Sequence, residues 1–175
     1  IHLLISINDL DRLVLCDHHT KQLKSFRHLM KDTLRPGIKF EHQFKIAKSK
    51  TVPALYPESE DFLVMPEVFA TGYMVGFLEW ACVLAIKPHL NWPDEQSVGT
   101  YIDVSHEAAT PPGLIVYANV ELTEVDGKRL TFSVEANDGV DLISKGWHQR
   151  YVINKKDFDD RVRKKLSRSS PVNKL

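Results

Sequence analysis

The chain has 175 residues, of which 43% are hydrophobic and 26% are charged. This composition is that of an ordinary globular protein, and the length fits one domain with little room for a second. Lysines plus arginines equal aspartates plus glutamates at 23 each, so the formal net charge is zero. Such a balance argues against nucleic acid as the main partner, because phosphate binding normally shows as a basic excess.

Three features predict a cytoplasmic protein without a membrane partner. Two cysteines, Cys16 and Cys82, are too few for a disulfide framework and suit a reducing compartment. The apolar start Ile1–Leu4 has no cationic region before it, so we do not interpret it as a signal peptide. The longest apolar stretch, Val68–Ile86, carries Glu79 near its centre, which favours a buried helix over a membrane span.

The chain divides into three parts. Residues 1–34 show no sustained hydrophobic period, and we treat them as an N-terminal appendage of uncertain order. This appendage holds three closely spaced histidines, but no cysteine or acidic cluster accompanies them, and we predict no metal site there. The domain proper is predicted over residues 35–167, and residues 168–175 form a C-terminal tail.

The predicted elements begin with a strand at residues 38–46, where apolar and polar side chains alternate. A proline-containing loop leads to a helix over residues 72–86, which is apolar nearly all round and is therefore expected to be buried. Pro88 and Pro93 end this helix.

Four strands separated by turn residues follow, and a short helix closes the chain. The strands are predicted at residues 98–109, 114–125, 130–136 and 142–153, and the helix at 156–166. Short turns require antiparallel neighbours. An antiparallel sheet wrapped around one long buried helix is an α+β architecture and is the plan of the hotdog fold.

Glu79 does not fit the pattern of its helix, because it is the only charged residue between Tyr73 and Ile86. A carboxylate surrounded by apolar side chains must be paired, protonated or functional. The alternative is a side chain at the edge of the helix that reaches solvent. Cys82, in the same helix, is interpreted as core packing.

His106 is the second exception, because it continues the apolar face of the predicted strand after Ile102 and Val104. A lone inward histidine is often a satisfied core residue. A histidine and a carboxylate in one apolar pocket are, however, candidates for acid–base catalysis. Thr71 lies eight residues before Glu79 and can share its side of the helix, although its simpler role is that of the N-cap.

Several well-known sites are missing from the sequence. It has no glycine-rich phosphate loop, no Cys-x-x-Cys pair, no His-Glu-x-x-His and no Gly-x-Ser-x-Gly elbow. We therefore expect no cofactor and no metal. The residues alone indicate a small α+β domain with a candidate His/Glu site facing its helix.

Residues 35 to about 165 resemble the fluoroacetyl-CoA-specific thioesterase family of hotdog proteins. The resemblance rests on several stretches in the same order and at near-identical spacing. They are Leu55-Tyr56-Pro57-Glu58-Ser59, Pro66-Glu67-Val68-Phe69-Ala70-Thr71-Gly72, Glu79-Trp80-Ala81-Cys82, His106 with Ala108-Ala109-Thr110-Pro111-Pro112-Gly113, and Asp138-Gly139-Val140-Asp141.

The resemblance implies an acyl-CoA thioester as substrate and a homodimer with active sites at or near the subunit interface. It also implies a catalytic set of threonine, glutamate and histidine, which falls on Thr71, Glu79 and His106. The family's glycine with an N–H near the thioester carbonyl falls on Gly99, and its arginine associated with coenzyme A falls on Arg150. Whether Glu79 is the nucleophile or the base that activates water stays open.

The sequence departs from the family pattern at Met65, where the fluoroacetate-specific member has an aromatic gate residue. Phe62 lies nearby and could cover part of the pocket. Because methionine is flexible where phenylalanine is rigid, we predict a broader or different short-chain preference. The alternative functions are a hotdog hydratase or dehydratase and a non-catalytic acyl-CoA-binding module.

Overall fold

The computed structural model describes residues 3–4 and 30–168 of the chain. The predicted domain over residues 35–167 lies inside this range. The predicted appendage lies outside it except for residues 3–4 and 30–34, and so does residue 169 onward. The three closely spaced histidines of the appendage, His18, His19 and His28, therefore lie outside the described residues.

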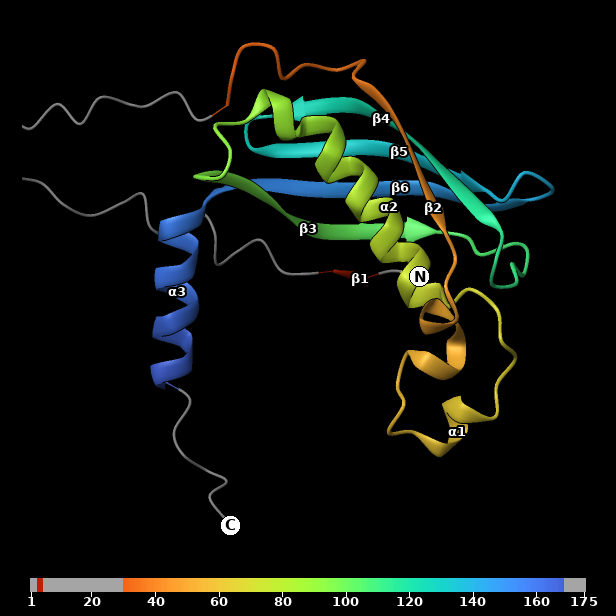
Figure 1. The fold of residues 1–175 in the computed structure, drawn as a ribbon. Helices are drawn as coiled ribbons and strands as arrows, with labels where there is room; N and C mark the ends of the chain where they lie inside the picture. Colours follow the sequence, from red (N-terminus) through yellow and green to blue (C-terminus); the bar gives the residue numbers. More distant parts are fainter. Residues whose placement is uncertain (1–2, 5–29, 169–175) are drawn as a thin grey trace, which may run out of the picture.

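One antiparallel sheet curves around the long helix α2, Thr71–Ile86 (Figure 1). Its strand order in the described part is β1-β3-β6-β5-β4-β2, and each neighbouring pair is antiparallel. The strands are β1 Leu3–Leu4, β2 Lys39–Lys45, β3 Glu95–Val104, β4 Ile115–Asp126, β5 Arg129–Asn137 and β6 Leu142–Asn154. The predicted α+β architecture is confirmed, with β1 as an additional short strand on the edge of β3.

Two shorter helices flank this core. Helix α1, Glu60–Leu63, lies beyond the N-terminal end of α2, and helix α3, Lys155–Arg168, follows β6 (Figure 1). Single 3-10 turns lie at Lys48–Lys50, Val52–Ala54 and Lys87–His89. Within residues 3–4 and 30–168, no helix is long and apolar enough to cross a membrane.

The core forms between one side of α2 and the inner face of the sheet. Alternating side chains of β4, β5 and β6 are buried there, as expected for strands with one face in the core. The inner side of α2 contributes Met74, Leu78, Ala81, Cys82 and Ala85. The prediction that α2 is buried all round is wrong for a single protomer, because Gly72, Gly76 and Trp80 are exposed on its outer side.

The strand predicted over residues 98–109 begins and ends earlier in the structure, where β3 spans Glu95–Val104. Its pairing with β6 runs from Glu95–Asn154 to Val104–Gly146, with a register shift between Gly99 and Tyr101. Gly146 has φ +153°, and a Cβ there would clash with the carbonyl oxygen of Asp103. The two backbones approach closely at this pair. Beyond it, the backbone N–H groups of Ser105 and Glu107 donate to the carbonyl oxygens of Lys145 and Ile143. His106 lies in the loop that these bonds hold, rather than on the inner face of a strand.

This close approach predicts that Gly146→Ala destabilises the protein strongly, because the clash is with backbone and cannot be relieved by a side-chain rotation. We expect the free energy of unfolding to fall by about 3 kcal/mol or more. Guanidinium chloride titrations measure it. Ser133→Ala, a change on the outer face of β5, is the control and should stay within about 0.5 kcal/mol. Equal effects of the two changes would contradict the analysis.

Candidate active site

Thr71 and His106 are in direct contact at the N-terminal end of α2. The Thr71 Oγ1 atom lies 2.8 Å from His106 Nδ1. Thr71 is the first residue of the helix, Ala70 is the N-cap, and the cap makes no side-chain hydrogen bond. Thr71 therefore does not have the predicted capping role, and its hydroxyl forms a hydrogen bond with His106 instead. His106 is exposed and lies at the end of α2, not beneath it as predicted.

The loop that carries His106 is anchored at both sides. The carbonyl oxygen of Thr110 accepts a hydrogen bond from the backbone N–H of Phe69, just before α2. The buried Thr110 hydroxyl donates to Asp138 Oδ2 at 2.9 Å. Asp138 Oδ1 in turn accepts two backbone N–H groups of its own turn. These bonds connect the position of His106 to the helix entry and to the β5–β6 turn.

The pKa of His106 is lowered from its ordinary value of 6.5. Partial burial of the ring lowers the pKa, and a backbone hydrogen bond with Ala108 offsets this in part. The imidazole is therefore mainly neutral at pH 7. A neutral histidine beside a threonine hydroxyl can take up and return a proton, which is the requirement for general acid–base catalysis.

Glu79 lies two helical turns further along, against the backbone of β3. A Cβ at Gly99 would overlap Glu79 Oε1 and would lie 3.2 Å from His148 Cε1. Position 99 must therefore be glycine for the carboxylate to reach this place. The Glu79 side chain is 40% exposed. It is thus neither enclosed in the core nor free at the helix edge: one side faces the sheet and the other is accessible.

Arg150 is nearly buried beneath α2, with a relative exposure of 4%. Its Nε and Nη2 atoms donate to the hydroxyl and carbonyl oxygens of Ser97, both at 2.8 Å. Its Nη1 atom lies 3.8 Å from Glu79 Oε1. Burial lowers the pKa of Arg150 and the nearby Glu79 carboxylate raises it, and guanidinium groups stay charged in proteins. The cation therefore faces Glu79 rather than the outer surface.

His148 belongs to the same cluster, and the sequence analysis did not identify it. It is 1% exposed, and its Nε2 atom lies 3.6 Å from Glu79 Oε1 and 3.0 Å from Arg150 Nη1. Burial and the neighbouring Arg150 charge lower the pKa of His148 to about 4. The alternation that places Arg150 on the inner face of its strand places His148 there too, so a buried polar pair was the available signal.

The predicted catalytic side chains thus form two groups within one protomer. Thr71 and His106 form the first, and Glu79 with Gly99 and Arg150 forms the second. Thr71 and Glu79 are eight positions apart in the helix, which is a rise of about 12 Å. Among the described residues, no hydrogen bond joins Glu79 to the first group.

Phe62 and Met65 lie on α1 and in the loop after it. The Phe62 ring packs edge-on against Tyr56 with centroids 5.2 Å apart, and Met65 is 50% exposed. Helix α1 lies beyond the N-terminal end of α2, which is the end that carries Thr71 and His106 (Figure 1). The role of Phe62 and Met65 at the substrate pocket stays a prediction, and their position near this end of α2 is compatible with it.

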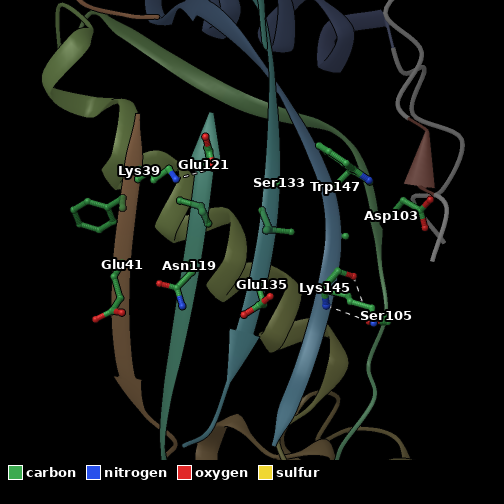
Figure 2. Close-up of a pocket in the computed structure, with 14 residues that line it drawn as sticks. Lys39, Glu41, Asp103, Ser105, Asn119, Glu121, Ser133, Glu135, Lys145 and Trp147 are labelled. Carbon is green, nitrogen blue, oxygen red and sulfur yellow. Dashed lines mark hydrogen bonds and ion pairs between the residues drawn. The ribbon is translucent and has the colours of Figure 1, made fainter. Parts of the chain in front are cut away.

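A groove of about 860 Å³ lies on the outer face of the sheet, away from α2. Figure 2 shows polar side chains of β2, β4, β5 and β6 across it, among them Lys39, Asn119, Ser133 and Lys145. None of the predicted site residues lines it. In the part of the chain that the structure describes, no three His, Cys, Asp or Glu side chains are grouped to hold a metal ion.

Comparison with known proteins identifies relatives of the chain. A sequence model of the family described as fluoroacetyl-CoA-specific thioesterase matches residues 51–156. A fluoroacetyl-CoA thioesterase of Streptantibioticus cattleyicolor is 54% identical over 136 residues, which cover 78% of this chain and 97% of that protein.

Solved structures extend this likeness to the fold. A structure of fluoroacetyl-CoA thioesterase superposes with a TM-score of 0.74 at 53% identity, covering 77% of this chain and 98% of its own. A hot-dog-like protein from Thermanaerovibrio acidaminovorans superposes with a TM-score of 0.63 at 22% identity, covering 75% of this chain and 92% of its own. The predicted hotdog fold is thereby confirmed.

The lowered pKa of His148 predicts a specific loss of stability in acid. In the unfolded chain this imidazole takes up a proton below about pH 6.5, whereas in the folded protein it does so only near pH 4. The unfolded state therefore binds more protons as the pH falls through this window. The resulting loss of unfolding free energy is up to about 3 kcal/mol between pH 7 and pH 4.

Denaturant titrations of the wild type and of His148→Gln at several pH values measure this contribution. The variant has no proton to bind at position 148, so its unfolding free energy should fall less steeply between pH 6.5 and pH 4. Other titrating groups are common to both proteins and cancel in the comparison. Parallel curves for the two proteins would refute the assignment.

Proposed function

Because the chain belongs to the fluoroacetyl-CoA-specific thioesterase family, we propose that it is a thioester hydrolase that converts short-chain acyl-CoA to the free acid and coenzyme A. The observation that carries this proposal is the state of the Glu79 carboxylate. It is partly accessible and lies against the side-chain-free backbone at Gly99 with a cation 3.8 Å away. A carboxylate in this setting is available for attack on a carbonyl or for activation of water.

In the proposed reaction, water adds across the bond between the acyl carbon and sulfur. The Gly99 N–H polarises the thioester carbonyl as an oxyanion-type donor. Glu79 either attacks the acyl carbon, giving an acyl-enzyme anhydride that water then hydrolyses, or removes the proton from the attacking water. Neutral His106, oriented by Thr71, accepts the proton of the attacking water in the first route, or receives it from Glu79 in the second, and passes it to the coenzyme A thiolate. The products are a carboxylic acid and a free thiol.

Arg150 has a role close to the reacting atoms in this proposal. With 4% exposure beneath α2, its guanidinium is poorly placed for phosphate groups of coenzyme A at the surface. Its charge instead faces Glu79 and the thioester that this carboxylate would meet. The substrate contact expected of Arg150 is therefore proposed at the acyl end.

We also propose a homodimer in which Glu79 of one protomer and the Thr71–His106 pair of its partner form each active site. Two observations support it. The outer side of α2 leaves Gly72, Gly76 and Trp80 exposed, and an apolar helix face of this kind is typical of a contact surface. The separation of about 12 Å along α2 prevents Glu79 from joining the pair of its own chain.

In this proposal, Met65 and Phe62 line the entrance of the pocket for the acyl group. Met65 is 50% exposed and unbranched, so it can move to admit acyl groups of different length. This supports a short-chain range broader than fluoroacetyl. A cytoplasmic location is part of the same proposal, and the free thiol of Cys82 in the core is compatible with it.

The function predicts release of free thiol from acyl-CoA thioesters, with little discrimination at the Met65 gate. We expect turnover of fluoroacetyl-, acetyl-, propionyl- and butyryl-CoA, and a ratio of kcat/KM for fluoroacetyl over acetyl below about 100, a difference of less than 3 kcal/mol. His106→Ala should lower kcat by 100-fold or more. A thiol-reactive dye reports each rate, and Met65→Phe tests whether an aromatic gate raises the ratio.

The other outcomes separate the rival functions. A hydrated product from an enoyl-CoA without thiol release would indicate a hydratase. Binding of acyl-CoA without turnover, in a folded protein, would indicate a binding module. A large preference for fluoroacetyl-CoA in the wild type would refute the proposed role of Met65.

The shared active site predicts complementation between two inactive variants. Glu79→Gln and His106→Ala proteins are purified separately, unfolded together, and refolded as a mixture. In a mixed dimer, one of the two sites receives Glu79 from one chain and His106 from the other. Random pairing makes half of the dimers mixed, so activity should recover to about a quarter of the wild-type value. Refolding each variant alone is the control, and a mixture as inactive as the controls would contradict a shared site.

A further inference from the structure

The buried imidazole of His148 has a defined tautomer. Its Nδ1 atom lies 2.8 Å from the backbone carbonyl oxygen of Tyr101. A carbonyl oxygen can only accept, so Nδ1 must carry the proton of this hydrogen bond. The side chain is 1% exposed, and a second proton would be a charge buried beside Arg150. The ring is therefore neutral, and its Nε2 atom has a free lone pair.

That lone pair accepts a hydrogen bond from Arg150. The Nη1 atom of Arg150 lies 3.0 Å from His148 Nε2, while Nε and Nη2 donate to Ser97 at 2.8 Å each. Every nitrogen of the guanidinium thus has an acceptor, and each acceptor is neutral. The group is fixed at three points by β3 and β6 without the help of a carboxylate.

Glu79 stands outside these hydrogen bonds although it is the nearest anion. Its Oε1 atom lies 3.8 Å from Arg150 Nη1 and 3.6 Å from His148 Nε2, both beyond the range of a hydrogen bond. The other titratable group facing the cluster is Cys82, and burial raises the pKa of its thiol to about 12, so it is uncharged. The Glu79 carboxylate therefore lies in the field of the cation, while none of the described residues donates a hydrogen bond to its oxygens, which leaves them available to water or substrate.

We propose that His148 is a positioning residue that acts through Arg150. By holding Nη1, it keeps the guanidinium from swinging towards Glu79 and shortening their 3.8 Å ion pair to a hydrogen-bonded one, which would occupy the carboxylate oxygens that the reaction needs. This inference rests on the proposed thioesterase function of Glu79. The neutral His148 imidazole thus keeps the Arg150 guanidinium near enough to stabilise the Glu79 carboxylate, but too far away to donate a hydrogen bond to it.

A double-mutant cycle tests the inference. We expect His148→Leu to lower kcat by about 10- to 100-fold, the cost of a misplaced catalytic group, with KM changed less than 3-fold. Arg150→Met should lower kcat at least as much. If His148 acts only through Arg150, the double variant should be no slower than Arg150→Met alone, within about 3-fold. Losses that multiply would overturn the inference.

His148→Gln is the conservative variant, because its amide oxygen can accept from Arg150 where Nε2 does. Its kcat should recover to within about 5-fold of the wild-type value. Thermal unfolding of all variants shows whether they are folded at the assay temperature. A glutamine variant as slow as the leucine variant, with both folded, would overturn the positioning role.

Nitrogen-15 spectra of the imidazole give an answer that does not depend on turnover. At pH 7 we expect His148 to carry its proton on Nδ1 and none on Nε2. A proton on Nε2 would overturn the inference even in an active enzyme. A wild type that releases no thiol from any thioester would instead overturn the proposed function and this inference with it. Turnover combined with multiplying losses would overturn the inference alone.

Discussion

The buried guanidinium of Arg150 is the group on which the arrangement beneath α2 depends. A cation removed from water costs several kcal/mol unless acceptors satisfy its donors and an anion lies near it. Ser97 and His148, on the adjacent strands β3 and β6, accept one hydrogen bond from each of the three guanidinium nitrogens. The positive charge remaining beneath the helix explains why an otherwise apolar helix can carry Glu79 at this position. The helix, the two strands and the carboxylate thus require one another.

Much of this fold could be predicted from local pattern. Strict alternation and paired turn residues such as Asp126-Gly127 define the strands, because a strand with one buried face repeats every two residues. The helix was equally clear from its length and apolar composition. Glu79 could be identified without any knowledge of its partners, since a single charge in an apolar helix is an exception within its own sequence neighbourhood.

Other features depended on contacts between distant residues. The place of His106 depends on where β3 ends, and the loop after β3 is held by backbone hydrogen bonds to Ile143 and Lys145, which are far along the chain. Alternation indicates that His148 points inward, but its tautomer is set by the carbonyl group of Tyr101. Thr71 is likewise distinguished from an N-cap only by the neighbouring loop. The hydrophobic periodicity of a single segment does not reveal these contacts between distant residues.

The overlap of Glu79 with the space above Gly99 has an evolutionary consequence. The present place of the carboxylate and a side chain at position 99 exclude each other. Because the overlapping atom is the end of a flexible side chain, alanine at position 99 would move the Glu79 carboxylate away from β3 and leave the fold intact. Relatives that use the acid at this place should therefore keep glycine at this position, and an engineer can displace the acid without touching it.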